Sequence, residues 1–492
     1  MFRRGGPARV SAARSVLYGL SLVLNIGVSV ILARRLVAED YAAYQFATKR
    51  IIQYVTVPVS FFGLWSYRYL VARKRGAMGA LLILLAVSAL ISIPLGFYLE
   101  LYESRVGYGP AALASVVLIT MNIYFTVTSA LDALRPLRRA LLSVTYRLLY
   151  FSAIFGTLYL MEPSLQHAFL GTILATLAGA AVGAYWLGDV VDRGYFEEGY
   201  RTLKEWARTS KPLLISFVVG FLASLDAALA YPIAGDRVVA AFFVVAAVAT
   251  LVREAANNGL SYLHQYVLRT GDVAGAARAV YVVTAAAVPF FVYAAVNPVY
   301  VIYVFNPVYK WAATAMRAFM AIAIVEVVNA GLTNMAYGSV RDVGPESVPA
   351  FTRISVLTSL PSAIYLGALV SAMYAFRPYG AWGMLIGWAV AYGLRFALSA
   401  VLAYFKLVPE EGRAALRGRA LRLIVEIALS AALAVLIAPW SPPKKGLLAS
   451  IEVLGVPGAV YLAAYFGVLI ALDREIRSSI ASLIKGISSW AG

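Results

Sequence analysis

The sequence predicts an all-α membrane protein whose helices cross the bilayer about 14 times. Hydrophobic residues account for 62% of the 492 residues, and charged residues for only 13%. Soluble domains contain about 45–50% apolar and about 25% charged residues, so a soluble fold of this composition would expose large apolar patches. Apolar runs close to the ~20 residues that a helix needs to cross the hydrocarbon core recur along the whole chain.

The composition also excludes several classes of function. The chain has no Cys and two His, His167 and His264, so we expect no disulfide, no metal centre and no cofactor. A net charge of +18 would suggest nucleic acid in a soluble protein, but here we attribute it to cytoplasmic loops and expect no nucleic-acid partner. The longest predicted loop covers residues 189–211, which leaves no room for a catalytic domain, so we do not expect an enzyme.

The first apolar run is interpreted as a retained helix. Arg3, Arg4, Arg9 and Arg14 precede it, as in a secretory signal peptide. The run over residues 16–32 is long for a signal peptide, however, and no small-residue cleavage site follows it.

Fourteen spans are predicted in all. The first six lie near residues 12–33, 43–66, 78–100, 110–132, 142–161 and 167–188. The other eight lie near residues 212–233, 237–262, 278–300, 311–338, 350–374, 379–404, 420–438 and 448–471. The expected organisation is an N-terminal bundle (1–188), a cytoplasmic linker (189–211), a C-terminal bundle (212–404) and two further helices with a tail (405–492).

The charges of the loops predict the orientation. Basic residues concentrate in every second loop, as in the Arg73-Lys74-Arg75 cluster, and the intervening loops hold few. Cytoplasmic loops carry the excess of Lys and Arg. We therefore expect a multi-pass protein of the cell (cytoplasmic) membrane with both termini in the cytoplasm.

Residues recur at matching places in the two halves. They are Ala33, Leu36, Glu39, Arg135 and Arg147 in the first half, and Ala230, Ile233, Asp236, Arg341 and Arg353 in the second. Transporters are often built from two structural repeats, so the recurrence favours a six-plus-six duplication with two appended spans over chance similarity.

Two of these regions carry a family resemblance. The segment Ile31-Leu32-Ala33-Arg34-Arg35-Leu36, followed by Glu39-Asp40-Tyr41, resembles the end of the first helix in polysaccharide/oligosaccharide flippases. Lys211-Pro212-Leu213-Leu214, with Asp226 beyond it, is similar to the start of that family's second half. One departure is Ala42, where the family usually has Gly. The family belongs to the multidrug/oligosaccharidyl-lipid/polysaccharide superfamily, as does the lipid II flippase.

This resemblance implies two pseudo-symmetric six-helix bundles around a central cavity, in a monomer that works by alternating access. The implied cargo is a polyprenyl-linked oligosaccharide monophosphate or diphosphate, used for surface polysaccharide or glycoprotein assembly.

Six cationic side chains lie inside the predicted spans. They are Lys49, Arg50, Arg147, Arg253, Arg317 and Arg395. Because a charge at the bilayer centre costs about 2.5–3.5 kcal/mol on insertion scales, their recurrence indicates a wet, positively charged cavity that binds an anion. Arg suits phosphate through its multidentate donors. Lys49 and Arg147 lie near span ends, where the alternative is snorkelling to the headgroups; similarity to the lipid II flippase favours Arg50 and Arg253.

Two acidic residues lie deep in predicted spans. Asp226 and Glu326 are candidates for coupling to Na⁺ or H⁺, because an isolated carboxylate there would bind a proton or a cation. The alternative is that each is a structural partner of an Arg or of a neighbouring helix.

A lipid-linked oligosaccharide flippase is the preferred prediction, because intramembrane cations outnumber acids. An ion-coupled multidrug/cation antiporter of the same superfamily is the alternative, and it would need a carboxylate-rich cavity. A membrane glycosyltransferase or ligase is a further alternative, which would need an acidic metal site at the outer surface.

Overall fold

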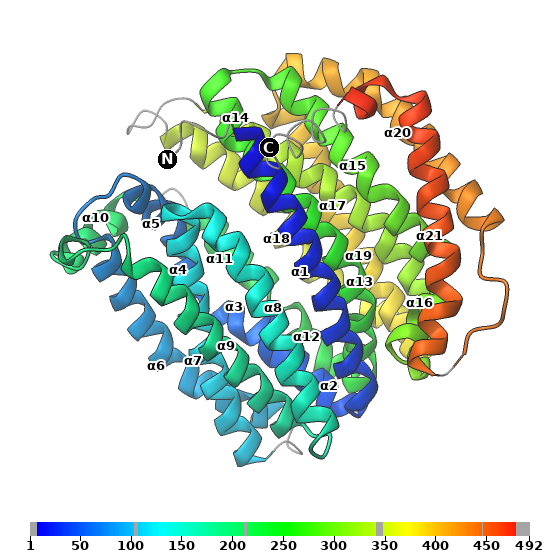
Figure 1. The fold of residues 1–492 in the computed structure, drawn as a ribbon, viewed down its shortest axis with the longest axis horizontal. Helices are drawn as coiled ribbons and strands as arrows, with labels where there is room; N and C mark the ends of the chain where they lie inside the picture. The colour runs from blue at the N-terminus through cyan, green and yellow to red at the C-terminus, as the bar shows by residue number, and fades with distance from the viewer. Residues whose placement is uncertain (1–6, 103–106, 211–213, 341–347, 445, 479–492) are drawn as a thin grey trace, which may run out of the picture. The chain divides into compact units, whose positions relative to one another are not determined.

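The computed structural model describes residues 7–102, 107–210, 214–340, 348–444 and 446–478, and these residues fold into helices without strands (Figure 1). The predicted all-α class is confirmed. Lys211-Pro212-Leu213, part of the resemblance, and Arg341, part of the proposed repeat, lie outside the described residues.

Five of the first six predicted spans correspond to single long helices. They are α1 (Pro7–Arg35), α6 (Ala77–Tyr102), α7 (Tyr108–Leu134), α8 (Pro136–Tyr159) and α9 (Leu165–Gly188). Helix α7 packs against α6 and α9, and α8 packs against α9 (Figure 1). Arg35 ties the end of α1 to the end of α8 through hydrogen bonds from its Nε and Nη2 to the Leu158 carbonyl oxygen, at 3.0 and 2.9 Å.

The second span is broken into short pieces. They are α2 (Ala38–Gln45), the π-helical turn η1 (Phe46–Ile51), α3 (Ile52–Val55), α4 (Val57–Phe61) and α5 (Gly63–Val71). Pro58 near the start of α4 has no N–H to donate, which favours a helix start there. Lys49 and Arg50 lie in the π-helical turn, a rare geometry that is frequent at functional sites.

The polar stretch after the sixth span is folded. It contains the short turn η2 (Arg193–Tyr195) and α10 (Gly199–Thr209), an amphipathic helix that buries Trp206. Helix α10 packs on the start of α6, where a Cβ on Gly79 would lie 2.4 Å from the Phe196 carbonyl oxygen. Only glycine fits at this close approach. The predicted linker is therefore a packed element of the fold.

The second half continues with helices that match the remaining eight spans. They are α11 (Leu214–Ala223), α12 (Asp226–Ala234), α13 (Asp236–Leu260), α14 (Tyr262–Thr270), α15 (Val273–Val296), α16 (Pro298–Phe305), α17 (Ala313–Ser339), α18 (Val348–Phe376), α19 (Gly380–Leu402), α20 (Glu410–Leu436) and α21 (Leu447–Leu472). The seventh span is broken between α11 and α12, immediately before Asp226.

Length and composition identify a multi-pass membrane protein. Among the described residues, nine helical runs are long and apolar enough to cross a membrane, or ten with the bent pair Asp236–Thr250 and Val252–Leu260. One of those runs, Pro349–Leu407, contains both α18 and α19. Each of the fourteen predicted spans overlaps one described helix or a broken series of helices.

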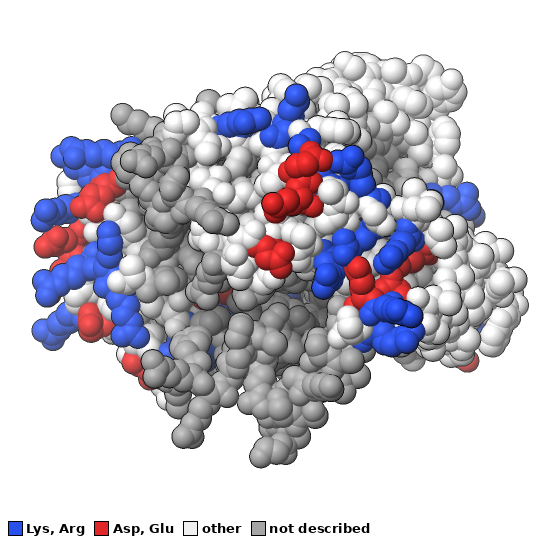
Figure 2. Space-filling view, turned by 90° about the horizontal axis from the view of Figure 1, so that it is seen from above, with Lys and Arg blue, Asp and Glu red and all other residues white. Residues whose placement is uncertain are grey.

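Charged side chains gather outside the apolar spans. Figure 2 shows Lys, Arg, Asp and Glu grouped over α10 and over the start of α20. At the start of α20, Glu410 forms ion pairs with Arg413 and Arg417. The cytoplasmic orientation of these loops remains a prediction.

The chain divides into two compact units. Residues Val16–Ala240 form the first unit, and the described residues from Ala241 onward make up most of the second. Helices α11 and α12 thus belong to the first unit, whereas the sequence repeat places the boundary between halves at residues 189–211. The predicted division into repeats stays a prediction.

Candidate functional site

A cavity of about 310 Å³ lies inside the first unit, between α1, the broken second span, α7 and α8. Its polar and aromatic lining consists of Asn25, Ser29, Tyr44, Gln45, Thr48, Lys49, Gln53, Thr56, Tyr124, Phe125, Arg139, Ser143, Tyr146, Arg147 and Tyr150. This lining includes three cations and no Asp or Glu. The cavity is therefore electropositive and rich in hydrogen-bond donors.

Two of the predicted site residues, Lys49 and Arg147, line this cavity. The Arg147 Nη1 donates a hydrogen bond of 2.6 Å to the Asn25 Oδ1 on α1, and its guanidinium lies 5.5 Å from the centre of the Tyr146 ring. The Arg147 side chain thus turns into the unit. In this arrangement the Arg147 guanidinium contacts Asn25 and Tyr146 and does not extend along the helix towards the headgroups.

Arg139 is a third cation of the cavity, and the sequence analysis did not single it out. Its Nη1 is buried and has no hydrogen-bond partner among the described residues. Arg139, Ser143 and Arg147 follow one another at intervals of four along α8, so they share one face of the helix. This spacing is the sequence signal for Arg139, which lies between the predicted spans 110–132 and 142–161.

Tyrosine rings form one wall of the cavity. Tyr146 stacks on Tyr124 with ring centres 4.1 Å apart, and on Tyr150 at 5.6 Å. The Tyr44 hydroxyl is 2.5 Å from that of Tyr150 and 2.6 Å from Thr172 Oγ1. The stacking and the hydrogen bonds hold the rings in place, so the wall is a preformed aromatic surface.

A second cavity of about 430 Å³ adjoins the first and shares Thr56, Phe125 and Arg139 with it. Its other polar lining residues are Ser60, Ser66, Tyr67, Asn122, Thr128, Ser129 and Asp132. The Asn122 side chain is fully buried, and among the described residues neither its Oδ1 nor its Nδ2 has a hydrogen-bond partner. Because buried amides are normally satisfied, Asn122 is available to a polar ligand or to water.

Arg50 is engaged in an ion pair. Its Nη2 donates to the Asp226 Oδ2 at 2.9 Å, where Asp226 begins α12. The Asp226 side chain is 2% exposed and that of Arg50 17% exposed. Nearby, the Tyr54 hydroxyl donates to the Ser224 carbonyl oxygen at 2.8 Å, at the break between α11 and α12. Lys49 thus lines the cavity while Arg50 pairs with Asp226, in keeping with the ~100° between adjacent residues on a helix.

Arg253 and Glu326 form a comparable pair in the second unit. The Arg253 Nη1 lies 2.6 Å from the Glu326 Oε2 and 3.3 Å from the Tyr392 hydroxyl. Glu326 is buried, with its side chain 3% exposed. Both acids predicted to couple to an ion, Asp226 and Glu326, therefore have an Arg partner in this structure.

The remaining predicted cations are placed differently from each other. The Arg395 guanidinium lies 5.2 Å from the ring centres of both Tyr365 and Phe396, and its Nε donates to Ser362 Oγ at 3.1 Å. Arg317 is exposed near the start of α17 and has no hydrogen bond or ion pair among the described residues. The structure therefore brings together Lys49, Arg147 and the additional Arg139.

The sequence itself matches no protein-family model and no curated protein. Solved structures do match. The lipid II flippase MurJ, in an inward closed conformation, aligns with a TM-score of 0.58 at 11% identity, over 93% of this chain and 99% of that one. An outward-facing multidrug resistance MATE family transporter of the MOP superfamily aligns with a TM-score of 0.51 at 17% identity, over 85% and 96%.

A third structure, a MOP superfamily transporter from Pyrococcus furiosus, aligns with a TM-score of 0.53 at 16% identity, over 81% of this chain and 94% of that one. Its description states that a reverse polarity of the binding pocket suggests a different function. These likenesses establish the fold. The chain is a multi-pass membrane protein with the fold of MOP superfamily transporters, which agrees with the fold that the resemblance implies.

Proposed function

We propose that this protein moves a polyprenyl-phosphate-linked oligosaccharide across the membrane by alternating access. The observation that carries the proposal is the electropositive cavity of the first unit, whose lining holds Lys49, Arg139 and Arg147 and no carboxylate. Positive charge inside a membrane protein is costly and marks a functional pathway. Its natural ligand is an anion.

The chemistry of the lining fits a phosphate group that carries sugars. Arg139 and Arg147 offer planar guanidinium donors to phosphate oxygens, and Lys49 adds a point charge. Tyr124 and Tyr146 present aromatic surface against which a sugar ring can pack. The adjoining cavity, with its hydroxyl groups and Asn122, has the polar partners that sugar hydroxyls require.

Two of the structural neighbours support the proposal. MurJ is a flippase for lipid II. The Pyrococcus furiosus transporter is described as having a binding pocket of reverse polarity. The cavity of this chain is electropositive, which is the opposite of what a cation-binding pocket requires.

An ion-coupled multidrug/cation antiporter is the second candidate, favoured by the fold shared with multidrug resistance MATE transporters. A cationic drug would require an acidic site. The two buried acids predicted to couple to an ion, Asp226 and Glu326, each pair with an Arg, so we place this function second.

Reconstitution tests the proposal. Purified protein in liposomes is expected to move a fluorescent polyprenyl-phosphate oligosaccharide between leaflets, and Arg139→Gln and Arg147→Gln are each expected to slow that movement at least tenfold. Arg138→Gln is the matched control, because Arg138 neighbours Arg139 but hydrogen-bonds to Asp189 and to the Trp186 carbonyl oxygen.

Equal rates in wild type and in both cavity variants would contradict the assignment of the cavity. Uptake of a lipophilic cation driven by an ion gradient, without movement of the lipid-linked sugar, would instead favour the antiporter.

A further inference from the structure

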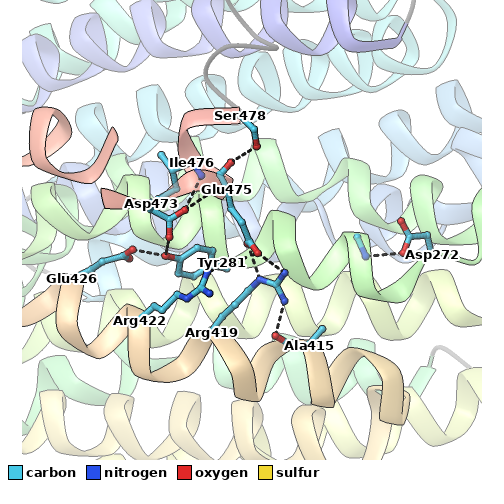
Figure 3. Close-up of polar contacts among 11 residues, drawn as sticks. Asp272, Tyr281, Ala415, Arg419, Arg422, Glu426, Asp473, Glu475, Ile476 and Ser478 are labelled. Carbon is cyan, nitrogen blue, oxygen red and sulfur yellow. Dashed lines mark hydrogen bonds and ion pairs between the residues drawn. The ribbon is translucent and has the colours of Figure 1, made fainter. Parts of the chain in front are cut away.

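A tyrosine hydroxyl and two carboxyl groups meet in the interior of the second unit. Tyr281 comes from α15, Glu426 from α20, and Asp473 directly follows α21. The Tyr281 hydroxyl lies between the two carboxyl groups (Figure 3). It is 2.6 Å from the Asp473 Oδ2, and it shares a short hydrogen bond with the Glu426 Oε1. All three side chains are buried.

Asp473 acts as the acceptor in this cluster. Its Oδ1 accepts hydrogen bonds from the backbone N–H groups of Glu475 and Ile476, at 2.7 and 2.9 Å. Burial raises the pKa of Asp473, but the hydrogen bonds from Tyr281 and the two N–H groups, with the charge of Arg422, outweigh burial and hold the pKa below its ordinary value. Asp473 is therefore the ionised member, and the Tyr281 hydroxyl donates to it.

The protonation state of Glu426 follows from the number of protons that Tyr281 can donate. A tyrosine hydroxyl has a single proton, and Tyr281 directs it at Asp473. Towards Glu426 the hydroxyl has only lone pairs, so a hydrogen bond between the two oxygens requires a proton on Glu426. We propose that Glu426, Tyr281 and Asp473 form a proton-binding site, in which protonated Glu426 donates to Tyr281 and Tyr281 donates to Asp473.

The surroundings of Glu426 support this assignment. Its Oε2 is buried without a hydrogen-bond partner among the described residues, which costs much less for a neutral carboxyl group than for an ion. Neither Glu426 nor Asp473 forms an ion pair in the described part of the chain. Arg419 is instead in a two-point contact with Glu475, at 2.9 and 2.8 Å (Figure 3).

The other titratable groups that face the site are few. Arg422 on α20 lies near both carboxyl groups and 3.9 Å from the Glu475 Oε1, and Tyr465 on α21 lies near Glu426. A metal ion is a poorer fit than a proton, because the described residues hold no group of three or more His, Cys, Asp or Glu that could bind one. A hydroxyl also lies directly between the two carboxyl groups.

The bound proton connects three segments of the chain. While Glu426 is protonated, hydrogen bonds run without interruption from α20 through α15 to the end of α21. Once the proton leaves, two carboxylates compete for one hydroxyl proton and repel each other. Glu426 then loses its donor bond, and α20 loses this attachment to the end of α21. The site therefore makes the packing of the last two spans dependent on protonation.

Infrared spectroscopy of the purified protein tests the site directly. Wild type is expected to show the C=O stretch of a buried protonated carboxyl group, and this band should bleach as pH is raised. Glu426→Gln should lose the band and keep a hydrogen-bond donor at the same place, so that variant is expected to fold. Glu411→Gln, at an exposed position of the same helix, is the matched control and should keep the band.

Two results would overturn the inference: persistence of the band in Glu426→Gln, or its absence from wild type at every pH. A band that disappears on adding Na⁺ at constant pH would show that the site binds a cation instead. None of these readouts involves transport, so the site and the proposed flippase function stand or fall separately.

Hydrogen exchange provides a second measurement. The amides of Glu475 and Ile476 are protected by Asp473. At a pH where the wild-type band has bleached, these amides should exchange at least threefold faster in wild type than in Glu426→Gln, because that variant keeps the attachment. Equal exchange in the two proteins would refute the link between protonation and packing.

Discussion

Removing either partner of the ion pair between Arg50 and Asp226 is expected to destabilise the first unit. The loss of stability should depend on which partner is removed. Asp226 is almost completely buried, with 2% of its side chain exposed, whereas 17% of Arg50 is exposed. Breaking a buried pair by removing one partner costs about 3–5 kcal/mol. Arg50→Met leaves the more deeply buried charge, that of Asp226, without its partner. The loss in free energy of unfolding should then be about 5 kcal/mol, unless Asp226 takes up a proton. Asp226→Leu should lie near 3 kcal/mol, because Arg50 can reach water.

The double variant Arg50→Met with Asp226→Leu is the informative one. Replacing both charges by apolar side chains of similar size is often neutral or stabilising, so its free energy of unfolding should return close to that of wild type. The measurement is equilibrium unfolding in mixed detergent micelles for wild type, both single variants and the double variant, which together form a double-mutant cycle.

Additive losses in the cycle would refute the view that the two side chains stabilise each other. The double variant also separates structure from function, because it is expected to fold while lacking Arg50. Retained transport by that variant would mean that Arg50 serves the fold, whereas lost transport would restore the sequence-based prediction that Arg50 contacts the substrate.

Three further predictions concern single residues. Gly79→Ala should separate α10 from α6, because a Cβ would lie 2.4 Å from the Phe196 carbonyl oxygen, and faster limited proteolysis within residues 189–211 would report it. Asn122→Leu should raise the free energy of unfolding by about 1–3 kcal/mol, since it removes two unsatisfied buried groups, while slowing movement of a lipid-linked sugar; a loss of stability would contradict this. The pKa of Asp272 lies below its ordinary value because the Tyr266 hydroxyl and the Gly275 N–H donate to it. The stabilisation it gives is present above the ordinary Asp pKa and lost as pH falls through the lowered one, so Tyr266→Phe should raise the pKa in an NMR titration, and an unchanged pKa would refute the role of Tyr266.

The helices could be predicted from the sequence because apolar length alone determines which segments cross a bilayer. The interruptions were harder to predict. The break before Asp226 and the π-helical turn at Phe46–Ile51 lie inside predicted spans, where no periodic pattern announces them. The mostly polar residues of α10 predict a linker, although Trp206 marks a buried face of a helix.

The sequence predicts cations inside the spans, but it does not predict which residues each of them contacts. The cost of burying charge predicts that the cations inside the spans matter, whereas their pairing depends on partners far away in sequence. Arg50 meets Asp226 across 176 positions, and Arg253 meets Glu326 across 73. Tyr281, Glu426 and Asp473 meet only through the packing of α15 with α20 and the end of α21, and no local pattern announces such a meeting.

The π-helical turn at Phe46–Ile51 makes the directions of Lys49 and Arg50 depend on the number of residues in the second span. A π-helical turn contains more residues than an α-helical one, so it adds a position to the second span. In this turn, Lys49 lines a cavity while its neighbour Arg50 is bound to α12. Deleting one uncharged residue there would let the segment close into an ordinary α-helix and would turn one end of the span by about 100° relative to the other. Lys49 and Arg50 could then no longer both keep their present directions. At this point the number of residues, as much as their identity, sets which side of the span each cation faces.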